Sequence, residues 1–319
     1  MRVLILLFLS IHYTILNSQS LVSNPDDAQF LTEDIDRFWM AFDSAAGKPE
    51  VEQQAIFQRQ YIDRASPGFR SWLVKRGKSV EELVTGINGM LPFYRSLWAD
   101  MVKIPNYIRD MRAGFYALEH LYPEANFPNV TFFVWYFFAT GSTTTDERLL
   151  IAAETHSINS ETPLDAIPEI HRPMVRSMTL ATLAPVAVHE SIHEQRPSSQ
   201  TGNLLHLAIE EGSADFIAEL CTGQNPSQAV HDYANAREAE LWKEFSGKMY
   251  TTEYDGWRYI PEDRPAGLAY WMGYKICEAY YEQAVDKREA VKTLIESNDY
   301  PAILEASGYA AKFGDGRKR

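Results

Sequence analysis

The stretch Val188-His189-Glu190-Ser191-Ile192-His193 decides how this sequence is interpreted. It lies in the segment 186–195, whose apolar residues recur at helical spacing. Residues four apart lie on one face of a helix, about 5–6 Å from each other, so His189 and His193 are placed to direct both imidazoles at a single metal ion. Glu190 leans over the same ion, where it is positioned to take a proton from metal-bound water. The pattern is the zinc metallopeptidase signature, and the alternative is a helix with two partly exposed histidines and a surface glutamate.

A catalytic zinc takes three protein ligands and keeps one position open for water. The metzincin arrangement requires a glycine three residues after His193 and a histidine six residues after it. Those positions hold Arg196 and Ser199, so that arrangement is excluded. His206 fits no such spacing either, and we interpret it as a core residue or a residue beside the ligands.

A second predicted helix, 204–221, carries the stretch Glu210-Glu211-Gly212-Ser213-Ala214-Asp215. Glu211 is predicted as the third ligand, because the chain between it and His193 is long enough for a loop and an antiparallel return. Asp215 lies one turn later and is predicted to accept the spare N–H of a ligand histidine. The small residues between them let this helix approach the first one closely. The alternative for these acidic residues is a solvated helix face.

The pair HESIH (189–193) and EGSAD (211–215) resembles the gluzincin class of zinc metallopeptidases. Within that class the sequence is most similar to a family of predicted Zn-dependent bacterial proteases that carry HExxH, then EGxAD, then a tyrosine-rich segment near the C-terminus. Here the last element is Ala269-Tyr270-Trp271-Met272-Gly273-Tyr274, with Ala269 at a position where glycine is common. The resemblance covers residues 126–284.

The resemblance implies hydrolysis of peptide bonds by zinc-activated water, with Glu190 as general base and a peptide or protein as substrate. The tetrahedral oxyanion needs a donor besides the metal. Tyr270 and Tyr274 are the predicted donors, and His231 and Arg264 are the weaker candidates. The alternative for the tyrosines is a role in the core or in the lining of a groove.

The resemblance also implies an edge strand beside the site that holds the peptide backbone by strand addition. Residues 149–153 are the predicted edge strand, and 141–145 form a predicted mobile rim. Pro185 cannot donate into a helix ladder, so the helix with the two histidines is expected to start or kink there.

The expected fold class is α+β, mostly helical: a zincin-like metallopeptidase with a small sheet, an active-site helix and a following helix with the glutamate ligand. Strands are predicted at 129–138 and 149–153, and a capped helix start at Ser79. The remaining helices are predicted at 26–45, 51–62, 107–121, 229–245 and 267–284. The chain divides into a signal segment (1–20), an N-terminal helical subregion (21–125) and a catalytic region (126–319), and the last two are compatible with a single domain.

The first twenty residues are typical of a secretory signal, with an apolar run from Val3 to Leu9 and a cleavage pattern at Ser18-Gln19-Ser20. An N-terminal membrane anchor is the alternative, although the run is shorter than the roughly 20 residues that a span needs. No cysteine lies near the cleavage point, so we expect no lipid anchor of the bacterial lipoprotein kind. The protein is therefore expected to be exported, either periplasmic or secreted, with no stable membrane span after cleavage.

Composition excludes one class of partner. The chain has 43 acidic and 30 basic residues and a formal net charge of −13, whereas nucleic-acid binding begins with clustered basic residues. Its two cysteines, Cys221 and Cys277, are too few for a disulfide scaffold, and the sequence leaves open whether they pair.

Two functions remain from the sequence. The first is an exported zinc peptidase. The second is a non-catalytic, envelope-associated binding or assembly protein that keeps the zincin scaffold. Such proteins usually lose the general base or a ligand, and this chain retains Glu190, so the sequence favours catalysis. Peptide deformylase is disfavoured, because Glu211 supplies the ligand for which that enzyme uses a cysteine.

Overall fold

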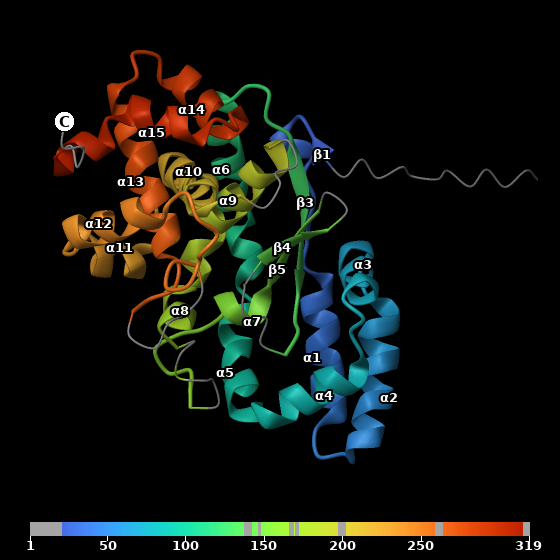
Figure 1. The fold of residues 1–319 in the computed structure, drawn as a ribbon. Helices are drawn as coiled ribbons and strands as arrows, with labels where there is room; N and C mark the ends of the chain where they lie inside the picture. The colour runs from blue at the N-terminus through green and yellow to red at the C-terminus, as the bar shows by residue number, and fades with distance from the viewer. Residues whose placement is uncertain are drawn as a thin grey trace, which may run out of the picture.

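A small sheet runs through the middle of the molecule, and helices surround it (Figure 1). The computed structural model describes residues 21–136, 142–145, 148–165, 169, 172–196, 202–258 and 264–314. The predicted signal segment lies outside these residues. Within them the predicted class, α+β and mostly helical with a small sheet, is confirmed.

The sheet is built around two parallel strands with buried side chains. The strands are β1 (Leu21–Val22), β2 (Phe30–Leu31), β3 (Phe127–Phe133), β4 (Ser142–Thr145) and β5 (Arg148–Ala152). Their order is β1-β3-β5-β4, and β2 also pairs with β3. Every residue of β3 is buried, which explains why its sequence is apolar and aromatic apart from Asn129 and Thr131.

The edge of the sheet differs from the prediction. The segment 149–153 was expected at the edge, but its strand, β5, lies between β3 and β4. The edge strand is β4, which pairs antiparallel with β5, so that Thr143 faces Leu150. The rim predicted at 141–145 is therefore a strand over 142–145, because a run of β-branched threonines suits an extended backbone. Gly141 lies outside the described residues.

The N-terminal part of the chain is a series of short helices. They are α1 (Glu33–Ala45), α2 (Glu50–Gln60), η2 (Ile62–Arg64), α3 (Pro67–Lys75), α4 (Val80–Gly89), α5 (Leu91–Met101), η3 (Ile104–Tyr107) and α6 (Ile108–Leu121). The predicted capped start is confirmed, because the Ser79 side chain accepts from the Glu82 N–H while Glu82 accepts from the Ser79 N–H. The helix predicted at 26–45 is shorter than expected, since η1 (Pro25–Asp27) and β2 occupy its first residues.

The helices of the second half lie, together with α6, on the side of the sheet opposite α1 to α3 (Figure 1). They are α7 (Ala153–His156), α8 (Arg172–Ser177), η5 (Leu180–Thr182), α9 (Leu183–Gln195), α10 (Leu204–Thr222), α11 (Gln228–Asn235), α12 (Glu238–Lys248), α13 (Leu268–Gln283), α14 (Lys287–Glu296), α15 (Tyr300–Ser307) and η6 (Tyr309–Phe313). Pro185 lies in the first turn of α9, as expected for a helix start. The single helix predicted at 229–245 is two helices, because α11 ends at Asn235, whose side chain accepts from the Trp271 indole N–H.

Glycines let the central helices approach closely. A Cβ at Gly273 on α13 would lie 1.6 Å from the carbonyl oxygen of Ala208 on α10, and one at Gly212 on α10 would lie 2.2 Å from the Tyr274 nitrogen. Backbone therefore packs directly on backbone where α10 and α13 cross. In the same way, a Cβ at Gly114 on α6 would lie 2.7 Å from a methyl group of Val188 on α9. These contacts fix α9, α10 and α13 relative to one another.

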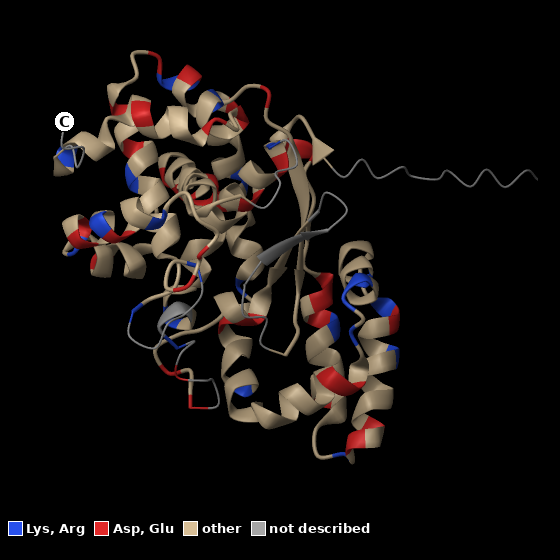
Figure 2. Cartoon of the chain, in the orientation of Figure 1, with Lys and Arg blue, Asp and Glu red and all other residues tan. Residues whose placement is uncertain are grey.

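One hydrophobic cluster joins both halves of the chain, from Ala28 to Tyr309. The domain boundary near residue 125 stays a prediction, and the element order by itself does not establish a zincin-like fold. Acidic and basic residues are interspersed along the helices (Figure 2). Among the described residues, no helix combines the length and the apolar character needed to cross a membrane.

Candidate metal centre

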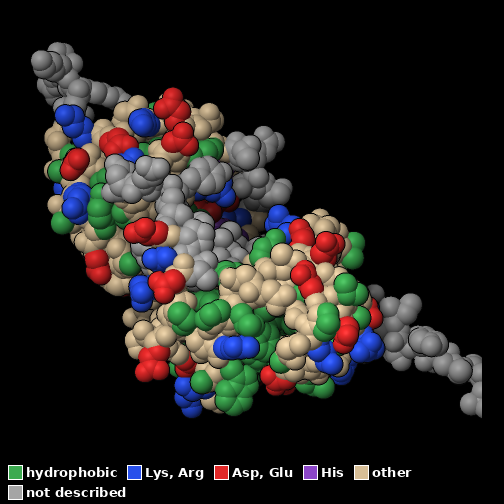
Figure 3. Space-filling model, turned by 90° about the horizontal axis from the view of Figure 1, so that it is seen from below, with side chains coloured by type: hydrophobic (Ala, Val, Ile, Leu, Met, Phe, Trp, Pro, Cys, Tyr) green, Lys and Arg blue, Asp and Glu red, His purple; other side chains and the backbone are tan. Residues whose placement is uncertain are grey.

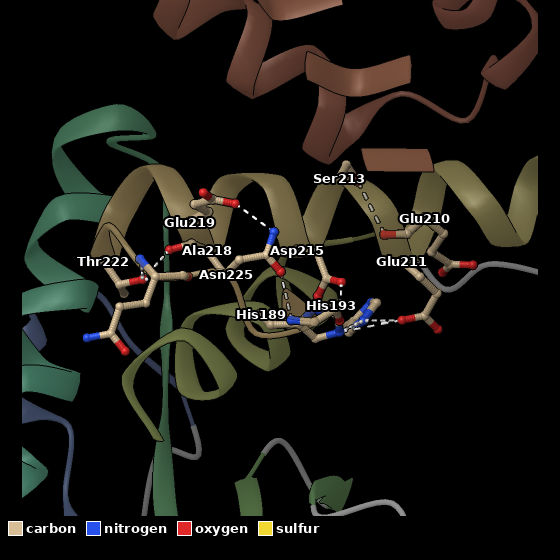
Figure 4. A network of polar contacts seen from close by, with 12 residues as sticks. His189, His193, Glu210, Glu211, Ser213, Asp215, Ala218, Glu219, Thr222 and Asn225 are labelled. Atoms are coloured by element: carbon tan, nitrogen blue, oxygen red, sulfur yellow. Dashed lines mark hydrogen bonds and ion pairs between the residues drawn. The ribbon is translucent and has the colours of Figure 1, made fainter. Parts of the chain in front are cut away.

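Three predicted ligands meet between α9 and α10. The Nε2 atoms of His189 and His193 are 3.0 Å apart. Glu211 Oε2 lies 3.4 Å from the first of these nitrogens and 3.2 Å from the second. Figure 4 shows the two histidines on α9 and the Glu211 carboxylate pointing toward one another. These residues form a set whose donor atoms can all reach a single metal ion.

The spacing of the three atoms matches a tetrahedral zinc site. Zinc bonds of about 2.0–2.1 Å at tetrahedral angles place neighbouring ligand atoms about 3.3–3.4 Å apart. The observed separations, 3.0, 3.2 and 3.4 Å, form a triangle of nearly that size. Two imidazole nitrogens and a carboxylate oxygen are also donors that Zn2+ accepts. The residues therefore fit the metal that the sequence predicts.

Asp215 contacts the first of the two histidines. Its Oδ1 lies 2.7 Å from His189 Nδ1, and its other oxygen accepts a hydrogen bond from Ser227 Oγ at 2.8 Å. In the neutral tautomer whose Nδ1–H donates to Asp215, the Nε2 lone pair of His189 faces the metal position. Asp215 is almost fully buried, so water does not compete for this contact.

The charged groups of the site strongly shift the pKa values of one another. Burial by itself lowers the pKa of His189, but the charge of Asp215 and the hydrogen bonds to Asp215 and Glu211 outweigh it and raise that pKa well above its usual range. Burial by itself raises the pKa of Glu211, but the two histidines outweigh it and hold that pKa well below its usual range. The carboxylate is therefore kept in the charged form that a metal requires.

Only one of the two predicted tyrosines lies beside the three metal ligands. The Tyr270 ring lies parallel to the His189 ring, with centroids 6.3 Å apart and an angle of 6° between the planes. Burial, followed by the charges of Glu211 and Asp215, raises the pKa of Tyr270 well above its usual range, so this phenol stays neutral. Tyr274 instead hydrogen-bonds to Glu219 and packs edge-on against His231, with centroids 4.6 Å apart.

The other sequence candidates occupy different places. Glu190 is on α9 beside His189, and its charge acts on both His189 and Tyr270. Arg264 makes two hydrogen bonds with Glu244, at 2.8 and 2.9 Å. His206 pairs with Glu210 at 3.3 Å, which agrees with its exclusion from the ligands.

Two contributors were missed by the sequence analysis. Ser227 precedes α11 and donates to Asp215 from a part of the chain that no motif marks. Arg196 follows α9 and donates to the Ser213 hydroxyl on α10, so it ties the two ligand-bearing helices together. A side chain that reaches across a loop leaves no periodic signal, so neither contact was predictable from spacing.

The structure holds Cys221 and Cys277 as free thiols. Burial raises the pKa of each thiol to about 12.

A family model described as Gliding motility protein GldB matches residues 23–311. The chain belongs to this family. No curated protein and no solved structure matches it. The match covers the whole metal centre and strands β2 to β5, so the family is defined over the same residues that carry the HESIH and EGSAD stretches.

Family membership corrects the function predicted from the motifs. The family is one of gliding motility lipoproteins, not a zinc metallopeptidase family, so the assignments to the gluzincins and to the predicted Zn-dependent proteases are wrong. The predictions of an enzyme, of peptide hydrolysis and of Glu190 as its base are wrong for the same reason. The physical cause of the error is that the spacing of HExxH and EGxAD specifies ligand geometry, which a protein can keep without turnover.

The localisation prediction holds in its coarser form. A lipoprotein family of the gliding apparatus indicates an exported, envelope-associated protein, which agrees with the signal-like N-terminus. The expectation of no lipid anchor concerns residues outside the described ranges and stays a prediction.

Proposed function

We propose that this chain is an exported, non-catalytic protein of the cell envelope that binds one Zn2+ and serves as a binding or assembly component of a gliding motility apparatus. The observation that carries the metal is the triangle of His189 Nε2, His193 Nε2 and Glu211 Oε2, with sides of 3.0 to 3.4 Å. The support for the motility role is the family to which residues 23–311 belong.

The protein's own residues prepare the site in defined ways. Asp215 orients His189 by accepting its Nδ1–H, and Ser227 in turn orients Asp215. Glu211 supplies the negative charge that balances the ion, and the neutral Tyr270 ring lies parallel to the His189 ring. A bound Zn2+ supplies a positive charge and an open coordination position that a donor atom of another molecule can fill.

The proposed role of the metal is structural and binding. Two ligands come from α9 and the third from α10, so an ion held by all three stabilises the arrangement of these helices. The proposal keeps a zincin-like set of ligands and gives Glu190 no role in turnover. We also propose that the protein is periplasmic or secreted. A boundary between the N-terminal helical subregion and the rest of the chain is proposed near residue 125.

The experiment compares four alleles in the source cells. The chromosomal gene is deleted and replaced by the wild type, Glu190→Gln, His193→Ala or Glu253→Gln, the last being an exposed control away from the site. Surface spreading should be lost on deletion, restored by wild type, Glu190→Gln and Glu253→Gln, and impaired by His193→Ala. Unchanged spreading in the deletion strain overturns the motility role, and loss with Glu190→Gln overturns the non-catalytic role.

A further inference from the structure

A cavity of about 390 Å³ lies among four N-terminal helices, in a part of the molecule separate from the metal centre. Side chains from α1, α2, α4 and α5 line it. Its volume lies within the range of about 300–1,000 Å³ that is typical of ligand pockets. Figure 3 views the molecule from this end and shows hydrophobic side chains gathered on the lower part of the face.

The inner wall of the cavity is apolar and firmly held. It includes Trp39 and Phe57, which are buried, and Phe42, which is half-buried. The Trp39 indole N–H contacts Met101 Sδ at 3.3 Å, and its ring meets Phe42 edge-on with centroids 5.2 Å apart. Contacts of this kind keep the rings in place, so the cavity is ready for an apolar side chain.

The mouth of the cavity is polar and carries charges of both signs. Arg95 and Asp43 both line it and are exposed, and no ion pair joins either of them to any residue that the structure describes. Asn88 donates to Gln53 at 2.9 Å, so two amides lie at the same mouth. Beside Arg95, on the same face of α5, the large side chain of Trp98 is 56% exposed.

We propose that this cavity binds a peptide segment of a partner protein, which inserts one bulky apolar side chain and pairs an adjacent carboxylate with Arg95. Apolar anchors in preformed pockets dominate many protein interfaces, and arginine forms two-pronged pairs with carboxylates. A peptide backbone also needs donors and acceptors, which the amides of Asn88 and Gln53 supply. A fatty acid has a single charged group and no backbone, so it leaves the amides of Asn88 and Gln53 without a match.

The test uses dye-labelled, acetylated peptides of about nine residues, a length suited to extended recognition segments. A central Leu, Phe or Trp is flanked by Asp in one set and by Lys in the other, and peptides with a central Ala serve as the reference. Binding to the full-length protein is measured by fluorescence polarisation. The Asp-flanked apolar peptides should bind at least about tenfold more tightly than the Ala reference.

Charge reversal at the mouth of the cavity distinguishes specific peptide binding from non-specific binding. Arg95→Glu should weaken Asp-flanked peptides about tenfold and favour the Lys-flanked set. Arg59→Glu, on the exposed face of α2 and outside the cavity, should leave both sets unchanged. Circular dichroism checks that each variant is folded.

Three results overturn the proposal. These are the absence of peptide binding up to roughly 1 mM, the same preference in Arg95→Glu as in wild type, and binding of dodecanoate without binding of peptides. Because the cavity shares no residue with the metal centre, none of these results depends on zinc.

Discussion

Asp215 Oδ1 lies 2.7 Å from His189 Nδ1, deep between α9 and α10, and this contact orients the ring whose other nitrogen faces Glu211. Carboxylates in this position fix the tautomer of a ligand histidine. Asp215→Asn should therefore lower zinc affinity about 10- to 100-fold while the protein stays folded. Competition with a chromophoric chelator measures this. Asp232→Asn, on the exposed face of α11, is the control and should leave affinity unchanged; equal affinity in Asp215→Asn would contradict the role of this contact.

The crossing of α10 and α13 depends on Gly273. A methyl group there would lie 1.6 Å from the Ala208 carbonyl oxygen, so the helices must separate. Gly273→Ala should lower the free energy of unfolding by about 3 kcal/mol, at the upper end of the usual cost of overpacking. Urea unfolding measures this. Gly247→Ala on α12 meets nothing within 4 Å and should be neutral or slightly stabilising. A neutral Gly273→Ala would show that the crossing is looser than described.

Acid should destabilise the protein through His156. Burial lowers the pKa of this ring to about 4, and the Thr179 backbone offsets the effect only in part. The unfolded chain takes up a proton below about pH 6.5 and the folded chain only near pH 4, so stability is lost as pH falls through that window. The loss from this group is about 3 kcal/mol at pH 4.

The measurement is the free energy of unfolding in urea between about pH 4 and pH 7. His156→Asn should flatten the pH dependence. His120→Asn, at an exposed position on α6, should retain it. An unchanged slope in His156→Asn would assign the acid sensitivity to other groups.

The two cysteines should be free in the isolated protein. Both are thiols in the structure, and burial raises the pKa of each to about 12, so little reactive thiolate forms near neutral pH. Unfolded, unreduced protein should react with a thiol reagent at both Cys221 and Cys277, whereas the folded protein should react slowly. A requirement for reductant before labelling would reveal a disulfide.

Much of the metal centre was predictable because the spacing of residues along a helix determines which side chains lie on the same face. His189 and His193 are four positions apart, as are Glu211 and Asp215, so each pair shares a helix face. The end of α10 was also predictable, since Gly223 adopts the left-handed conformation expected just after a helix.

The rest depended on contacts between distant segments. The pairing of Tyr274 with Glu219 and His231, which removes it from the ligands, follows from the rotation of α13 against α10 and has no signature in the sequence. The position of β5 inside the sheet depends on β4 folding back beside it. Function was the least predictable property, because the same three ligand atoms suit a catalytic ion and a structural one.

The most direct measurement is the zinc content of the purified protein by plasma mass spectrometry after dialysis against metal-free buffer. The wild type and Glu190→Gln should each carry one Zn2+ per chain, and His189→Ala, His193→Ala and Glu211→Ala should each carry almost none while their circular dichroism shows a folded chain. Zinc at about 100 times its dissociation constant should also stabilise the wild type by about 2.7 kcal/mol. A wild-type protein without zinc, or one whose zinc survives loss of His193, would contradict a metal centre between α9 and α10.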